Sequence, residues 1–130
     1  MSNGTRPTVA TVFAILHFVF GALGIIFGLI GLGALFALRQ YVSLFFSLLS
    51  FCLSGFMIYA GVTLFTDKKN AVEINKLYAF ASAGLTVINF IVFKIMGYPY
   101  GMFGLLLGLI YPALLFFLVV QNENVKKFYS

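Results

Sequence analysis

Residues 8–37 read TVATVFAILHFVFGALGIIFGLIGLGALFA, a stretch that contains no Asp, Glu, Lys or Arg. About 20 mostly apolar residues are enough to cross the ~30 Å hydrocarbon core of a bilayer. Because this stretch is longer, we expect a spanning helix that is tilted or projects past the headgroups. A cleaved signal peptide is the alternative, but its apolar region is normally about 7–15 residues long and precedes a small-residue cleavage site. We therefore predict a retained transmembrane helix.

Charged residues divide the rest of the chain into three further apolar stretches. The predicted helices cover residues 8–37, 41–65, 71–93 and 101–120, followed by an interfacial tail at 121–130. Since short connections make consecutive helices antiparallel neighbours, we expect an up-down-up-down bundle. The predicted fold class is all-α: one integral membrane four-helix bundle that occupies the single domain 1–130. In the tail, the spacing of Val125, Phe128 and Tyr129 predicts an apolar helix side that lies along the membrane surface.

Composition excludes the other broad classes of protein. The chain is 62% hydrophobic and only 8% charged, and its mean hydropathy is +1.09. Soluble domains carry about 25% charged residues. Disordered chains are poor in apolar and aromatic residues. The single cysteine, Cys52, allows neither an intrachain disulfide nor a cysteine-based metal site.

The basic residues predict the orientation in the membrane. Six would lie on one side and two on the other: Arg6, Lys68, Lys69, Lys76, Lys126 and Lys127 against Arg39 and Lys94. The positive-inside rule then places both termini in the cytoplasm, and we expect a bacterial plasma membrane. The six can also bind anionic lipid headgroups, although we prefer a role in topology alone. We expect no nucleic-acid partner, because these charges stand at the ends of apolar stretches.

Small and polar residues recur at alternating steps of four and three in each predicted helix. Those expected to pack helices together are Gly21, Gly24, Gly28, Ser47, Ser50, Ser54, Gly104 and Gly108. A mean spacing of 3.5 residues is typical of the seam of a left-handed helix pair. In lipid, close backbone approach through Gly, Ala and Ser replaces the hydrophobic effect as the source of association. We therefore predict a compact bundle that turns Phe and Leu to the lipid.

His17 is the first residue to examine for a function. It is the only histidine, and it lies about 13 Å into the first helix at 1.5 Å per residue. An ionisable group inside a membrane is a functional candidate by default. Pro112 cannot donate to the carbonyl of Gly108. Our hypothesis is that neutral His17 hydrogen-bonds Tyr111, Ser82 or that carbonyl.

Three roles for His17 stay open at this point. The preferred one is a satisfied polar packing residue. A proton relay or substrate contact is the second, although no acidic residue is buried to share protons with it. A pigment or haem ligand is the third. Otherwise no cofactor and no metal are predicted, and we interpret Asn89, near the far interface, as interhelical packing.

No catalytic motif is present, and the acidic residues Asp67, Glu73 and Glu123 are all interfacial. We therefore predict that the chain is not an enzyme. The first functional hypothesis is an accessory or structural subunit that packs within a larger membrane complex, with other membrane protein subunits and the lipid bilayer as partners. The alternative is a small transporter or channel that acts as a homo-oligomer.

Two families are similar in size and plan. The small multidrug transporters carry a membrane-embedded Glu in their first helix, where this chain has Ala14 and His17. The fluoride channels are similar in length, but their Asn- and Phe-based pore pattern is not evident. No site is carried over from either. The residues Arg-Pro-Thr at 6–8, Ala-Ile-Leu at 14–16 and Gly-Ala-Leu-Gly at 21–24 resemble many small uncharacterised bacterial membrane proteins, a resemblance over about a quarter of the chain that implies no activity.

Overall fold

The computed structural model describes residues 5–97 and 102–130, and all regular structure within them is helical. The elements are α1 (Thr8–Ala37), α2 (Tyr41–Phe65), α3 (Ala71–Ile95), α4 (Met102–Leu115), the π-helix η1 (Phe116–Val120) and α5 (Glu123–Phe128). With α4 and η1 taken together, four helices are long and apolar enough to cross a membrane. The predicted bounds 8–37 and 41–65 are confirmed, whereas α3 extends past residue 93. The predicted start of the fourth helix at Gly101 lies outside the described residues.

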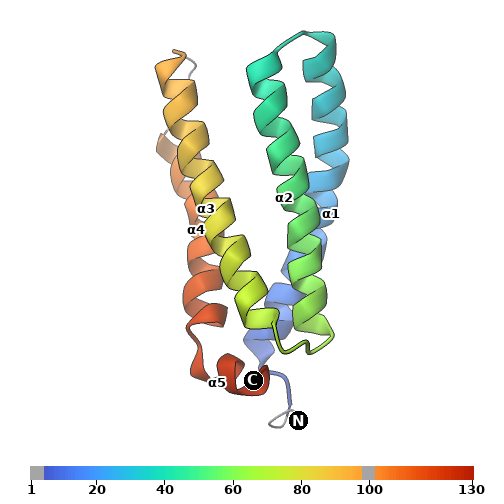
Figure 1. The fold of residues 1–130 in the computed structure, drawn as a ribbon, viewed down its shortest axis with the longest axis vertical. Helices are drawn as coiled ribbons and strands as arrows, with labels where there is room; N and C mark the ends of the chain where they lie inside the picture. Colours follow the sequence, from blue (N-terminus) through green and yellow to red (C-terminus); the bar gives the residue numbers. More distant parts are fainter. Residues whose placement is uncertain (1–4, 98–101) are drawn as a thin grey trace.

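The helices form two pairs, α1 with α2 and α3 with α4 (Figure 1). Three glycines allow the backbone of α1 to approach α2. A Cβ added at Gly21 would lie 2.5 Å from Cγ1 of Ile58, and one at Gly24 would overlap Oγ of Ser54. Gly28 meets Phe51 in the same way. Since real side chains essentially never come this close, these positions of α1 require glycine or a local shift of α2.

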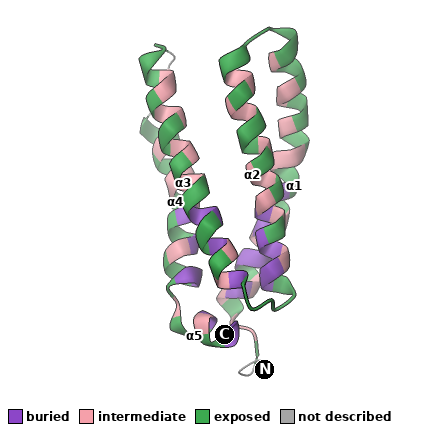
Figure 2. Cartoon of the chain, viewed as in Figure 1, coloured by how far each residue is buried: buried purple, intermediate pink, exposed green. Residues whose placement is uncertain are grey.

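The buried residues gather in one half of the bundle, the half nearest α5 (Figure 2). The core consists of Ala10, Phe13, Ala14, Met57, Ala60, Leu64, Ala71, Tyr78, Ala79, Leu115, Val119, Val125, Phe128 and Tyr129. In the other half, large apolar side chains such as Phe27 and Phe103 are 64% and 74% exposed. The bundle predicted to be compact throughout is therefore tightly packed at one end only.

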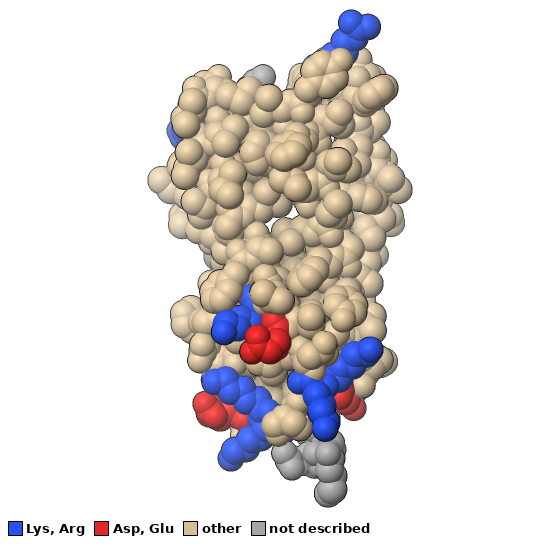
Figure 3. Space-filling model, in the orientation of Figure 1, with Lys and Arg blue, Asp and Glu red and all other residues tan. Residues whose placement is uncertain are grey.

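Charge separates the two ends of the molecule. We call the end that carries Arg6, Asp67, Lys68, Lys69, Glu73, Lys76, Glu123, Lys126 and Lys127 the charged end, and the end that carries Arg39 and Lys94 the opposite end. The space-filling view shows the acidic side chains and most of the basic ones at the charged end (Figure 3). The C-terminus and the α2–α3 loop lie at this same end (Figure 1).

Pro112 lies inside α4, which continues to Leu115 before widening into η1. Proline removes the hydrogen bond that would end on the carbonyl of Gly108. The hydroxyl of Thr86 on α3 lies 3.4 Å from that carbonyl, but its shorter hydrogen bond, at 2.9 Å, is to the carbonyl of Ser82. Single π turns are uncommon inside helices, and they accommodate an irregular pattern of backbone hydrogen bonds. The fourth segment thus remains helical while its backbone departs from α geometry.

α5 turns back beneath the bundle (Figure 1). Asn122 caps its start, because its side chain accepts hydrogen bonds from the N–H groups of Asn124 and Val125. Val125 is 0% exposed, and Phe128 and Tyr129 are also buried. The structure thus differs from the expected apolar contact with the membrane surface: this side of the tail packs into the chain's own core.

Candidate functional site

His17 is completely buried at the centre of a polar cluster that joins four helices. Its Nδ1 lies 2.6 Å from the hydroxyl of Tyr111 on α4, and its Nε2 lies 2.8 Å from Oδ1 of Asn75 on α3. The amide of Asn75 donates onward to the carbonyls of Ala71, at 2.8 Å, and Ala60 on α2, at 3.3 Å. Four helices are therefore connected through one imidazole and one amide.

The network determines which ring nitrogen carries the proton. Asn75 uses its NH₂ group as the donor to Ala71 and Ala60, so its Oδ1 faces the imidazole and can only accept. His17 must then donate from Nε2, which leaves Nδ1 to accept from the hydroxyl of Tyr111. This tautomer is assigned from the hydrogen bonds. A neutral imidazole satisfies every partner in the cluster.

Aromatic rings enclose the imidazole on its remaining sides. Tyr78 and Tyr111 lie edge-on to it with ring centroids 5.5 Å and 5.6 Å away, and Phe13 lies 6.3 Å away. Phe13 also stacks on Tyr111 at 5.7 Å. Gly61 makes room for the histidine, because a Cβ there would lie 2.9 Å from Cβ of His17.

This geometry has direct chemical consequences. Both ring nitrogens of His17 are occupied, so a haem, pigment or metal could bind only after one hydrogen bond was broken. Among the described residues, no group of His, Cys, Asp or Glu side chains could hold a metal ion. What the cluster does as built is connect α1 to α2, α3 and α4 at the depth where the core is densest.

The predicted hydrogen bond between His17 and Tyr111 is confirmed. Ser82 and the Gly108 carbonyl are not partners, because Tyr111 and Asn75 take the two ring nitrogens. Asn75 is a partner that the sequence argument did not assign to this site. Residues of the sequence were matched by counting from the start of each helix. This concealed the pairing of His17 with Asn75, because α1 begins farther toward the charged end than α3 does.

The remaining candidates lie away from this cluster. Oδ1 of Asn89 is buried without a hydrogen-bond partner in the described part of the chain. Gly108 packs on Thr86, but a Cβ at Gly104 would meet nothing within 4 Å. Among the serines, Ser54 meets Gly24, Ser47 is half-buried and Ser50 is exposed. Gly104 and Ser50, which are both exposed, therefore make no close glycine contact within the described residues.

A second polar cluster closes the charged end around the last turn of α2. The guanidinium of Arg6 donates to Oδ1 of Asp67 at 2.8 Å and to the carbonyl of Phe65 at 2.6 Å. The hydroxyl of Tyr129 donates to the carbonyl of Leu64 at 2.5 Å. Asp67 adopts a φ of 57°. Its carboxylate, at the start of the α2–α3 loop, holds Arg6.

Together these contacts satisfy the C-terminal carbonyls of α2. The last four carbonyls of a helix have no partner within it. Here the backbone N–H groups of Thr66 and Lys68 donate to the first two of these four carbonyls of α2. The side chains of Tyr129 and Arg6 donate to the remaining two. The hydrogen bond to Asp67 raises the pKa of Arg6, and burial raises the pKa of Tyr129 to about 12. Both groups therefore stay in their donor forms near neutral pH.

The chain matches no family model, no curated protein and no solved structure.

Proposed function

We propose that this chain is a non-enzymatic membrane protein that packs as an accessory or structural subunit against the helices of a larger membrane complex. Its helices cross a bacterial plasma membrane as an up-down-up-down antiparallel bundle with both termini in the cytoplasm. The excess of basic residues at the charged end supports this orientation.

The unequal burial of the two halves carries the proposal. Near the charged end the helices bury a common core, but toward the opposite end they leave their small-residue faces uncovered. A Cβ at Gly31, Gly55, Gly84 or Gly104 would meet nothing within 4 Å among the described residues. Membrane helices associate through such small residues, because close backbone contact is what lipid tails cannot supply. A helix of another subunit fits this face better than lipid does.

Gly31 is the clearest position for such a helix. It continues the line of Gly21, Gly24 and Gly28, each of which meets α2, yet a Cβ at Gly31 would meet nothing within 4 Å among the described residues. The glycine face of α1 therefore continues past its last close contact with α2, and a partner helix would contact it there. Gly33 lies on the other side of α1 at the same depth.

The polar cluster supports a structural role over a transport role. His17 has no free ring nitrogen, and its partners are an amide and a phenol rather than a carboxylate. A proton or substrate pathway would need a group that exchanges its partners. The homo-oligomeric transporter or channel is therefore the less favoured alternative, and the same experiment distinguishes it.

The test is copurification of the tagged chain from native membranes in a mild detergent. We expect a stable assembly with a different membrane protein, lost in Gly31→Leu and kept in Gly33→Leu. A Cβ at either position would meet nothing within 4 Å among the described residues, so the pair compares two faces of α1 that are both open at this depth. Recovery as a monomer would overturn the proposal. So would recovery as a homo-oligomer that conducts ions or moves a substrate in liposomes.

A further inference from the structure

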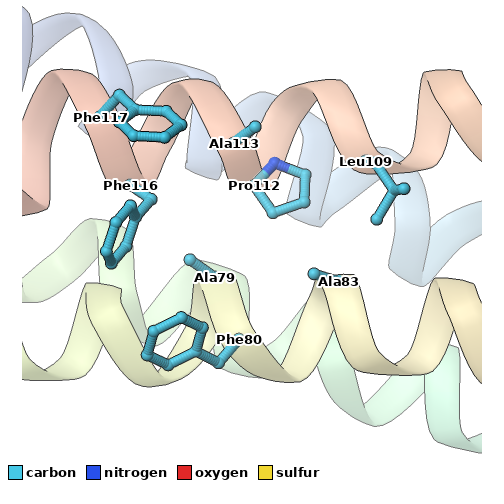
Figure 4. A pocket seen from close by; sticks show the side chains of 8 residues that line it. All are labelled: Ala79, Phe80, Ala83, Leu109, Pro112, Ala113, Phe116 and Phe117. Carbon is cyan, nitrogen blue, oxygen red and sulfur yellow. The ribbon is translucent and has the colours of Figure 1, made fainter.

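A groove lies on the outside of the bundle between α3 and the fourth segment, apart from the His17 cluster. Its volume is about 320 Å³. Figure 4 shows Leu109 and Pro112 on α4 facing Ala79 and Ala83 on α3 across it. Phe80, Phe116 and Phe117 complete one end, so every side chain that lines the groove is apolar.

The sequence explains why the groove exists. Three alanines, Ala79, Ala83 and Ala113, line it where larger residues would close the space between the helices. Phe80 and Phe116 contact each other across the groove, with centroids 5.4 Å apart. The lining of the fourth segment runs from Leu109 to Phe117, about 12 Å at 1.5 Å per residue. One leaflet of the hydrocarbon core is only slightly deeper, about 15 Å.

The groove opens toward the membrane, not toward another helix of the chain. Phe80 and Phe117, at its rim, are 55% and 67% exposed. An occupant would therefore enter sideways from the bilayer, and the lining offers it apolar contact alone. An acyl chain has the shape and chemistry that such a space accepts.

A second, polar cavity lies on the same side of α3 at the charged end. It has a volume of about 290 Å³ and is lined by Lys69, Val72, Glu73, Lys126, Tyr129 and Ser130. Glu73, Lys76, Phe80 and Ala83 recur at steps of three and four, which places them on one face of α3. Lys76 therefore lies between the polar cavity and the apolar groove.

The charges of this face fit a phospholipid headgroup. Lys69 and Lys76 are exposed, whereas Lys126 pairs with Glu123 at 3.5 Å. Among the described residues, no ion pair involves Lys69 or Lys76. Two ammonium groups favour a phosphate, and the carboxylate of Glu73 can accept a hydrogen bond from a headgroup hydroxyl.

We propose that this face binds one anionic phospholipid, with an acyl chain in the groove of Ala79, Ala83 and Pro112 and its phosphate at Lys76. The headgroup lies in the polar cavity beneath. The site differs from nonspecific attraction of basic residues to a charged surface, because the groove holds one chain at one position. It is also independent of any protein partner on α1.

The experiment uses the full chain, reconstituted in nanodiscs of phosphatidylglycerol and phosphatidylcholine and then analysed by native mass spectrometry. We expect one retained phosphatidylglycerol per chain. Lys76→Gln should weaken its retention about fivefold, since each basic residue near the surface contributes ~1 kcal/mol. Lys94→Gln, the same charge change at the opposite end, should leave retention unchanged.

A second pair of variants tests the groove. Ala83→Phe fills it and should lower the retention of both lipids, whereas Ala81→Phe, on the exposed opposite side of α3, should not. The proposal is overturned if both lipids are retained equally or if Lys94→Gln acts like Lys76→Gln. It is also overturned if folded Ala83→Phe keeps its lipid. If Ala83→Phe does not fold, the comparison of Lys76→Gln with Lys94→Gln decides whether the proposal stands.

Discussion

His17 forms its two hydrogen bonds with side chains from two different helices. Loss of one partner should cost more stability than loss of the other. Tyr111 gives a single hydrogen bond to the ring. Asn75 accepts from the ring and donates to two backbone carbonyls on two helices. The amide therefore holds the cluster together more than the phenol does.

We expect Asn75→Leu to destabilise the folded protein more than Tyr111→Phe. Removing the Tyr111 hydroxyl should cost about 0.6 kcal/mol, the mean for interhelical hydrogen bonds in a membrane. Removing the amide should cost about 2 kcal/mol, because the buried N–H of His17 loses its acceptor, whereas the carbonyl of Ala60 keeps the hydroxyl of Thr63 at 2.7 Å. Unfolding in mixed detergent micelles measures both. Equal losses, or a larger loss for Tyr111→Phe, would contradict the assigned roles.

The tautomer of His17 is a second prediction at this scale. The hydrogen-bond network requires the proton on Nε2, with Nδ1 as an acceptor. Nitrogen NMR of selectively labelled histidine reads this directly, since the chain has only one. In Asn75→Leu the preference for Nε2–H should weaken, because its acceptor is gone. An Nδ1–H tautomer in the unmodified protein would refute the network.

At the scale of single elements, the packing of α1 on α2 depends on where along the line its glycines stand. Gly24 lies against Ser54, whereas a Cβ at Gly31, two turns farther on, would meet nothing within 4 Å among the described residues. The same residue type at the same spacing therefore has two different roles. One position brings two helices of this chain together, and the other leaves a face open.

Gly24→Leu should accordingly destabilise the protein by about 1–3 kcal/mol, the usual cost of overpacking. Gly31→Leu should change stability by less than about 0.5 kcal/mol, as substitutions without close neighbours do. Both substitutions add the same side chain to one helix, so the difference isolates the contact with α2. Thermal unfolding in detergent gives the comparison, and similar losses for the two variants would rule out this explanation.

The sequence predicted the helices well and the contacts between them only in part. Hydropathy alone places α1 and α2, because a membrane span leaves few other solutions. The seam of Gly21, Gly24 and Gly28 also follows from periodicity. Periodicity cannot say where a partner helix diverges, so Gly104 was predicted as a packing residue although a Cβ there would meet nothing within 4 Å among the described residues. The relative depth of helices is equally hidden, which is why Asn75 was missed as a partner of His17.

For the whole molecule, the charged end acts as a closure. Arg6 and Tyr129 lie near opposite ends of the chain, yet both donate to carbonyls in the last turn of α2. The tail after the fourth segment is thereby fixed to the end of α2, where the residue just before α1 is also bound. Because the densest core lies directly above, opening this closure should loosen the whole bundle rather than one terminus.

Rising pH tests the closure through Tyr129. In the unfolded chain Tyr129 has its ordinary pKa of 10.0, and burial raises the pKa of Tyr129 in the folded protein to about 12. Between these values the unfolded chain releases the proton first, so unfolding becomes easier as pH rises. The contribution of Tyr129 to stability should be constant below pH 10, fall through this interval and level off above it.

Tyr129→Phe removes the titrating group together with its hydrogen bond to the carbonyl of Leu64. We expect this variant to be less stable than the parent at neutral pH and to show a smaller loss of stability between pH 10 and 12. Taking the difference between the two proteins cancels the titration of the lysines and the other tyrosines, which both share. Parallel stability curves over this interval would mean that the Tyr129 hydroxyl is not held at Leu64, and that the tail is not part of the closure.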